Sequence, residues 1–441
     1  MLRNSVVVGW GFGSLGLAVI LNTLNVLLIG YLTLVVGIDP ALAGSLVLFA
    51  KLYDVLTDLP MGWITDRTRT RWGSRRPYLF IAGFITPMSL YMLFSPPAGD
   101  KVVYVTAALL LYATGYTLFN VPYLSMPAEM SVDTHERTKM VAWRSLFIAA
   151  GTMFGVAFAP FLVGRLGGGY GAYTVLGQVM AATVAVAFLA CVFLTGQKKP
   201  PAETARSMPI REQLSTIIGN PHFRALMMIK ITHLLALSVG AGSLLFFFLF
   251  VLGYDLQTLG IYGALKTSIW AVTMPLWTRI ARRRGKRFGY FVGTVVYTVV
   301  TLSWLLAGQG ESWIALGIRG VAFGLISGGL LLMGNAMLQD VMDDDYRRSG
   351  VRKNGMFAGS YSLTEKITSG IGAQILGLVL SMSGFERTAS VQSESAIQGI
   401  YIAVSVIPAL LMFASLYFIH RYRLDESHLV AETDVAAART G

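Results

Sequence analysis

Twelve apolar segments, each about as long as a membrane is thick, recur along the 441-residue chain. A helix needs roughly 20 mostly apolar residues to cross a bilayer, and in lipid its backbone groups must be satisfied internally. We therefore expect twelve transmembrane helices and both chain ends on one side of the membrane. The segments run over residues 9–36, 41–65, 77–96, 102–126, 139–164, 172–195, 223–252, 257–281, 287–308, 312–338, 355–383 and 396–420.

Composition and charge agree with a multi-pass membrane protein. The chain is 54% hydrophobic and 13% charged, which is too apolar for a soluble protein of this length. Its net charge of +12 comes from short loops: 24 lysines and arginines lie on one side of the predicted topology and three on the other. This bias predicts cytoplasmic termini in the cell (inner) membrane, and it argues against a nucleic-acid partner.

A polar stretch after the sixth segment divides the chain into two halves. We expect an N-terminal six-helix bundle over 1–195, a cytoplasmic linker over 196–221, a second bundle over 222–420 and a tail over 421–441. The loop after the second segment carries Arg71-x-Gly73-x-Arg75, and an Arg-x-Gly-x-Arg sequence at 283–287 follows the eighth segment. Two similar halves indicate an all-α major facilitator fold with a central site and alternating access.

The second segment holds two carboxylates where lipid would disfavour them. Asp54, Thr57 and Asp58 share one helix face at about 3.6 residues per turn, so their oxygens can converge on one point. Oxygen ligands suit a hard cation, and an unpaired charge at this depth is costly. The alternative is structural: the two carboxylates could neutralise Lys51 and nearby arginines in the helix interface.

Several ordered motifs then resemble the glycoside-pentoside-hexuronide:cation symporters, the melibiose permease group of the major facilitator superfamily. They are WGFGSLG at 10–16, DVLTDLPMGWI at 54–64, the R-x-G-x-R-R-P pattern at 71–77, YTLFNVPYLSMPAEM at 116–130 with ERT and WR at 136–144, and AMLQDVMDDDYRRSGVRKNGMF at 336–357 followed by Lys366. The resemblance covers most of the chain.

The resemblance implies roles for individual residues. Asp54, Thr57, Asp58 and Thr117 fall on the family's cation site, with the two aspartates as ligands of a sodium ion, and Lys366 falls on a lysine that couples the halves. Tyr116 and Arg144 match positions that line the sugar cavity. The chain departs from the pattern at Ala18, Asn120 and Leu124, where melibiose-type members have two carboxylates and a tryptophan.

Further polar residues are candidates for substrate binding. Asn120 lies one turn from Tyr116, so both could bind a polyol, or they could instead form an interhelical hydrogen bond. Lys230, His233 and Arg319 could bind a carboxylate or phosphate; the alternative is snorkelling or pairing with a helix end. Lys366 should point to the second helix, since neighbouring Glu365 points about 100° away. Trp10, Trp143 and Trp270 could stack on a sugar or simply pack.

Charged loops could hold the molecule in discrete conformations. Asp66, Arg67, Arg71 and Arg75 are the candidate latch of the first half. The aspartates at 343–345, with Arg347 and Arg348, could act in the same way in the second half or form a solvated loop.

These observations predict a cation-coupled secondary symporter of a sugar, glycoside or uronide. Two close carboxylates need a cation between them or a retained proton; the threonine hydroxyls favour sodium, and the choice stays open. A lysophospholipid or other acidic amphiphile is the alternative cargo. We expect a small-molecule substrate and the bilayer as partners, with no obligate protein partner and no cofactor. An enzyme is disfavoured because nucleophile-elbow, phosphate-loop and His-rich metal motifs are missing, and a sensor because only eighteen residues follow Arg423.

Overall fold

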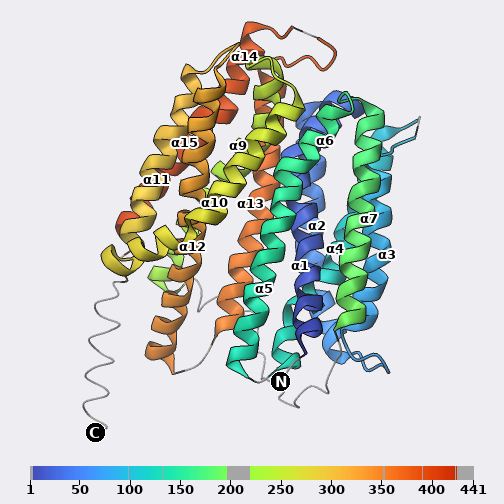
Figure 1. Cartoon of the computed structure of the whole chain (residues 1–441), viewed down its shortest axis with the longest axis vertical. Helices are drawn as coiled ribbons and strands as arrows, with labels where there is room; N and C mark the ends of the chain where they lie inside the picture. The colour runs from blue at the N-terminus through green and yellow to red at the C-terminus, as the bar shows by residue number, and fades with distance from the viewer. Residues whose placement is uncertain are drawn as a thin grey trace.

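The structure is a computed structural model that describes residues 3–97, 99–131, 133–195, 219–350, 353–389, 391–422 and 424. Within these ranges the chain forms twelve long helical rods and no strand (Figure 1). The rods are α1 with η1 (Asn4–Gly30, Tyr31–Val36), α2 (Pro40–Arg67), α3 (Arg76–Leu93), α4 (Lys101–Met130), α5 with η2 and α6 (Thr134–Met153, Phe154–Phe158, Ala159–Arg165), α7 (Tyr170–Leu194), α9 with η3 (Pro221–Phe246, Phe247–Val251), α10 (Leu256–Arg284), α11 with η4 (Lys286–Leu302, Ser303–Leu306), α12 (Trp313–Ser349), α13 (Asn354–Met382), and α14 with η5 and α15 (Glu394–Tyr401, Ile402–Val406, Ile407–Arg421).

The rods match the twelve predicted segments, and the all-α fold is confirmed. Eight of them are long and apolar enough to cross a membrane by length and composition alone. The other four in the described part of the chain are α2, α3, α10 and α13. Three of these rods carry charges well inside their length, namely Lys51, Asp54 and Asp58 in α2, Lys266 in α10, and Glu365 and Lys366 in α13.

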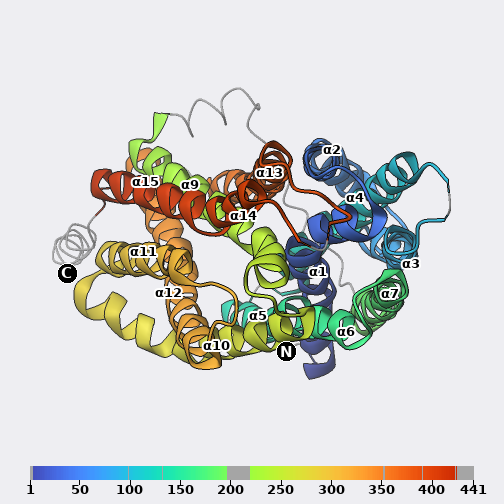
Figure 2. The same cartoon turned by 90° about the horizontal axis from the view of Figure 1, so that it is seen from above.

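The rods form two bundles. Viewed from above, α1 to α7 lie together on one side and α9 to α15 on the other (Figure 2). Residues 196–218, most of the predicted linker, lie outside the described residues, and so does almost all of the tail. The exact bounds of the two domains therefore stay a prediction.

Local capping residues, and not the limits of the apolar segments, set where several helices begin and end. Asp133 accepts a hydrogen bond from the His135 backbone N–H, so α5 begins five residues before the apolar segment that predicts it. The rod α12 continues to Ser349, eleven residues past its predicted end. An Asp344–Arg348 pair of 3.1 Å supports this polar extension, and Gly350, at a φ of 67°, ends it.

The same turn module occurs at the start of α2 and of α10. Each preceding rod ends in a π-helical turn and a left-handed glycine, Gly37 with φ 84° or Gly253 with φ 73°. An aspartate two residues later caps the next helix: Asp39 accepts from Ala41 and Leu42 N–H, and Asp255 accepts from Thr258 N–H. We call the end of the molecule that holds these two turns the turn end.

Glycines in this module bring the two bundles into backbone contact. A Cβ at Gly44 of α2 would lie 2.8 Å from the Ala373 carbonyl oxygen of α13, and one at Gly260 of α10 would lie 2.6 Å from the Ala157 carbonyl oxygen. The contact of α2 with α13 and the contact of α10 with the rod of α5, η2 and α6 thus have the same form in the two halves of the chain. The module Gly-x-Asp-x4-Gly appears twice in the sequence, at 37–44 and 253–260.

We predict that Gly263→Ala weakens the contact at the turn end. The added Cβ would overlap the backbone oxygen of Val156, so α10 must move away from η2. Overpacking of this kind costs about 1–3 kcal/mol, which is enough to raise the solvent accessibility of residues between the bundles at the turn end roughly tenfold. The measurement is the rate at which an impermeant maleimide labels an Asn25→Cys probe from the turn end, in a background without Cys191.

Gly317→Ala is the matched control, because its Cβ would meet no atom within 4 Å. Equal labelling rates in the two variants would show that the glycine contact does not hold the turn end closed.

Candidate functional site

A cavity of about 550 Å³ lies between the two bundles. Its walls come from both halves of the chain, and they mix hydroxyl, amide and charged groups with aromatic and aliphatic side chains. The lining includes Ser14, Ala18, Asn22 and Asn25 of α1, Lys51 of α2, Tyr116, Asn120 and Leu124 of α4, Arg144 and Thr152 of α5, Ser238 of α9, Tyr262, Lys266 and Trp270 of α10, Tyr297 of α11, Trp304 of η4, Phe323 of α12, and Ser362, Glu365, Lys366 and Thr368 of α13.

A cluster of charges links the bundles beside this cavity. Lys366 Nζ of α13 lies 2.9 Å from Asp54 Oδ2 and 2.5 Å from Asp58 Oδ2 of α2. The Asp54 side chain is buried at 4% exposure, whereas Asp58 keeps 27%. The two carboxylates therefore share one ammonium group, and Asp58 is the more accessible of the pair.

Two threonines complete the cluster. Thr117 Oγ1 of α4 lies 2.8 Å from Asp54 Oδ1 and 3.0 Å from Asp58 Oδ1, so its hydroxyl can donate to either carboxylate. Thr57 Oγ1 lies 3.2 Å from Thr117 Oγ1 and donates to backbone carbonyls of its own helix. Two carboxylates and a hydroxyl converge here, which is a donor set that suits a hard cation such as sodium.

A close approach of α13 to α2 makes the cluster possible. Gly370 lies one turn after Lys366, and a Cβ there would come within 3.0 Å of Leu48 and 3.1 Å of Lys51 Cβ. Because glycine leaves this space free, the two helix axes can come near enough for Lys366 to reach both aspartates. As expected, Lys366 faces α2 while Glu365 faces the other way and binds Lys230 at 2.8 Å.

The other predicted substrate residues divide into two groups. Tyr116, Asn120 and Arg144 line the cavity, and so do Ala18 and Leu124 at the positions where the melibiose pattern is lost. The three cationic candidates of the second bundle are outside the lining and are occupied elsewhere: Lys230 pairs with Glu365, His233 Nδ1 lies 2.8 Å from the Tyr290 hydroxyl, and Arg319 pairs with Glu311 at 3.1 Å and donates to the Ser303 carbonyl.

Of the three tryptophans considered, Trp270 lines the cavity. Trp10 packs instead: its ring stacks on Tyr123 at 5.0 Å and its indole N–H donates to the Tyr123 carbonyl oxygen. Trp143 contacts Phe147.

The candidate latch residues lie at the opposite end of α2 from the turn end. Arg75 pairs with Asp66 at 2.7 Å and donates to Thr65 Oγ1 at 2.6 Å. Arg67 lies over the Trp63 ring at 3.8 Å, and Arg71 is exposed. In the second half, Asp344 pairs with Arg348 and Asp345 with Lys353, so two of the three aspartates serve the end of α12.

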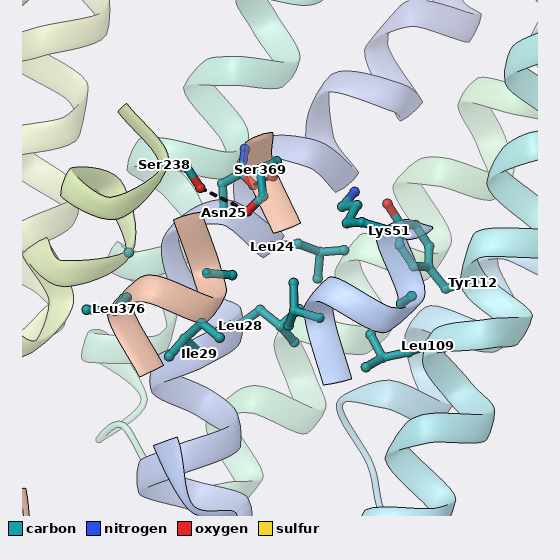
Figure 3. Close-up of a pocket in the computed structure, with 14 residues that line it drawn as sticks. Leu24, Asn25, Leu28, Ile29, Lys51, Leu109, Tyr112, Ser238, Ser369 and Leu376 are labelled. Atoms are coloured by element: carbon teal, nitrogen blue, oxygen red, sulfur yellow. Dashed lines mark hydrogen bonds between the residues drawn. The ribbon is translucent and has the colours of Figure 1, made fainter. Parts of the chain in front are cut away.

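A second, mostly apolar pocket of about 30 Å³ lies beside the cavity, nearer the turn end (Figure 3). The linings of the two share Asn25, Lys51, Ser238 and Ser369. Leu24, Leu28 and Leu376 are among the walls of the smaller pocket, and Ser369 donates to Asn25 Oδ1 across the bundles at 3.2 Å. Space of this size holds about one water molecule. The turn end is therefore sealed below the cavity in this conformation.

The sequence interpretation named Trp270 but missed its two neighbours on the cavity wall of the second bundle, Tyr262 and Lys266. Tyr262, Lys266 and Trp270 of α10 line the cavity at spacings of four residues. The signal was present: three large or charged side chains on one helix face, including a lysine deep in a predicted membrane span.

Comparisons with known proteins agree with this architecture. The family model described as MFS/sugar transport protein matches residues 9–426. The chain is 26% identical over 435 residues to the putative glycoside/cation symporter YagG of Escherichia coli (strain K12), covering 96% of this chain and 93% of that protein. It is 22% identical over 431 residues to the sodium-dependent lysophosphatidylcholine symporter 1-A of Danio rerio, with coverages of 89% and 80%.

Among solved structures, a point mutant of the nucleoside transporter NupG superposes with a TM-score of 0.69 at 13% identity, covering 94% of this chain and 98% of that one. This likeness confirms the major facilitator fold. With a family model spanning nearly the whole length and a central cavity between two helical bundles, the chain is a multi-pass membrane transporter and belongs to the MFS/sugar transport protein family.

Proposed function

We propose that the protein is a secondary symporter that couples a cation, bound at Asp54 and Asp58, to a sugar or glycoside in the central cavity. The observation that carries this proposal is the position of Lys366, whose ammonium group bridges both carboxylates from the opposite bundle. A coupling cation would use the same oxygens, so cation and lysine compete for one place. The proposed activity is transport, with no catalytic step.

This competition supplies a coupling mechanism. When the cation occupies the carboxylates, Lys366 is released and the charged link between α2 and α13 is lost. Cation occupancy then changes how the two bundles associate, and this in turn changes the shape of the cavity that they enclose. Since coupling free energy is reciprocal, a bound substrate that favours the same arrangement tightens cation binding by the same factor.

Sodium is the proposed cation. Two carboxylates and the Thr117 hydroxyl offer oxygen ligands, and Thr57 orients that hydroxyl. The name of one relative also describes it as sodium-dependent. A proton is the alternative, and it would require one of the two aspartates to be protonated when Lys366 leaves.

Three groups are proposed to bind the sugar from the first bundle: the Tyr116 hydroxyl, the Asn120 amide and the Arg144 guanidinium. The cavity volume lies within the roughly 300–1,000 Å³ typical of small-molecule sites. A lysophospholipid is the second candidate substrate, because aliphatic and aromatic residues form much of the lining and one relative is named for such cargo.

We further propose bundles at 1–195 and 222–420, a linker at 196–221 and a tail at 421–441, with both termini in the cytoplasm of a cell whose inner membrane holds the protein. The lysine and arginine bias supports this orientation. In that topology the sealed turn end faces outward. The Asp66–Arg75 pair, with Arg67 and Arg71, then forms the proposed cytoplasmic latch.

We predict that Asp58→Asn removes the effect of sodium on substrate binding. In the unmodified protein sodium should tighten binding of a glycoside at least about fivefold at fixed pH, as typical coupling energies imply. The variant keeps the cavity but loses one of two charged ligands, so its substrate affinity should be the same with and without sodium. Calorimetry on purified protein measures both affinities.

Asp100→Asn, a change at the exposed cap of α4, is the matched control. Sodium-dependent glycoside binding that persists in Asp58→Asn would contradict the proposed cation site. Binding of a lysophospholipid but of no sugar would instead contradict the proposed substrate.

We also predict that Lys366→Met makes the protein depend on sodium for stability. Removing one partner of a buried ion pair costs about 3–5 kcal/mol, because it leaves the two aspartates uncompensated. Sodium should restore that balance, so the rise in Tm on adding sodium should be larger in the variant than in the unmodified protein.

The control for this variant is Lys139→Met, an exposed lysine that bonds Asn4. A sodium-induced rise in Tm that is equal in Lys366→Met and in the unmodified protein would show that lysine and sodium do not share the site.

A further inference from the structure

The cavity holds more positive than negative charge. Its lining contains four cations, Lys51, Arg144, Lys266 and Lys366, and one acidic residue, Glu365. Lys366 is balanced by the two aspartates, and Glu365 is already bonded to Lys230. Lys51 lies one turn before Asp54 and is attracted by the same two aspartates. Among the residues that the structure describes, Arg144 and Lys266 form no ion pair with a carboxylate.

Lys266 is the unbalanced cation of the second bundle. Its side chain is half-buried, and its described contact is with the Phe323 ring, whose centroid lies 5.7 Å from Nζ. Its backbone is fixed in place, because a Cβ on Gly324 of α12 would lie 2.5 Å from the Lys266 carbonyl oxygen. A cation held at this depth over an aromatic ring gains some stabilisation, but no hydrogen-bond acceptor for it lies among the described residues.

The neighbours of Lys266 form an aromatic frame. Tyr262 lies one turn before it and Trp270 one turn after it on α10, and both line the cavity. The three side chains therefore follow one face of the helix. Aromatic rings of this kind pack against the apolar C–H face of a sugar, while the ammonium between them can donate hydrogen bonds to an anionic group.

Lys266 and Arg144 serve different depths of the cavity. Gly263 of α10 packs against Val156 on the rod that begins with α5. Both helices extend from this contact away from the turn end, α10 towards higher residue numbers and the α5 rod towards lower ones. Counted from the contact, Lys266 is three residues along α10 and Arg144 is twelve residues along the α5 rod. At a rise of 1.5 Å per residue, the Cα atoms of the two residues differ in depth by roughly 13 Å. Helical side chains lean towards the N-terminus of their helix, which is at the turn end for α10 and at the opposite end for α5, so the two charged groups lean further apart. One small anionic group cannot bind both.

We propose that Tyr262, Lys266 and Trp270 form a subsite for the carboxylate of an acidic sugar, so that the substrate is a uronic acid or uronide and not a neutral glycoside. This inference rests on the proposed function and adds the residue that selects the anion. A carboxylate supplies the acceptor that Lys266 lacks. It also balances the charge of the cotransported cation, so the loaded cavity carries less net charge through the membrane.

The test compares matched ligand pairs that differ only at C6, where a CH2OH group is replaced by a carboxylate: methyl glucoside with methyl glucuronide, and methyl galactoside with methyl galacturonide. Binding is measured by calorimetry with saturating sodium, on the full chain in lipid nanodiscs. The unmodified protein should bind one uronide tighter than its neutral partner by roughly tenfold to a hundredfold, the range expected for a hydrogen bond to a charged group.

Two variants and one control assign this preference to Lys266. Lys266→Met keeps the length of the side chain without its charge, and it should bind both members of a pair equally while retaining the affinity for the neutral sugar. Lys266→Arg should keep most of the preference for the anion. Lys139→Met, on the exposed face of α5, should behave as the unmodified protein.

Four outcomes overturn the inference. They are equal binding of neutral and acidic sugars by the unmodified protein, an anion preference that survives in Lys266→Met, loss of neutral-sugar binding in that variant, and binding of lysophosphatidylcholine in place of every sugar pair. In the first three cases a sodium-dependent sugar would still bind the unmodified protein, so the proposed symport would stand. The fourth would overturn the proposed sugar substrate as well.

Discussion

The rest of the structure depends on one ion cluster, in which Lys366 of one bundle lies between Asp54 and Asp58 of the other. Each of these charges would be costly alone in a membrane helix, and together they nearly balance. The cluster also joins the two halves of the chain through charge, because Asp58 and Lys366 lie 308 residues apart in sequence. Any ion that enters it must alter the contact between the bundles.

The same logic explains which helices are least apolar. Asp54 and Asp58 of α2 and Lys366 of α13 find one another only once the bundles have assembled, because their ion pairs cross the boundary between the bundles. Within the second bundle, Lys230 and Glu365 neutralise each other. Lys266 differs because its helix brings no carboxylate near it in the described part of the chain, which leaves its charge facing the cavity.

Much of this arrangement could be predicted from residues. Apolar segments divided by short polar loops placed all twelve helices, and the i, i+4 spacing of Asp54 and Asp58 placed both carboxylates on one face. The opposite directions of Glu365 and Lys366 also followed from helix geometry. The partners of Lys230, His233 and Arg319 could not be predicted, because they depend on which helices become neighbours. The side of α10 that faces the cavity could have been predicted from the four-residue spacing of Tyr262, Lys266 and Trp270.

The paired Gly-x-Asp-x4-Gly module has a consequence for how the turn end can open. Each of its two copies begins a helix of one bundle that is in backbone contact with a helix of the other. If the bundles rock as rigid bodies, the α2 contact and the α10 contact must break together, because α2 and α10 each hold the bundles in backbone contact. A partly open conformation then loses both sets of contacts and forms no new ones. The turn end should therefore open in one cooperative step, with little passage of solutes through intermediate conformations.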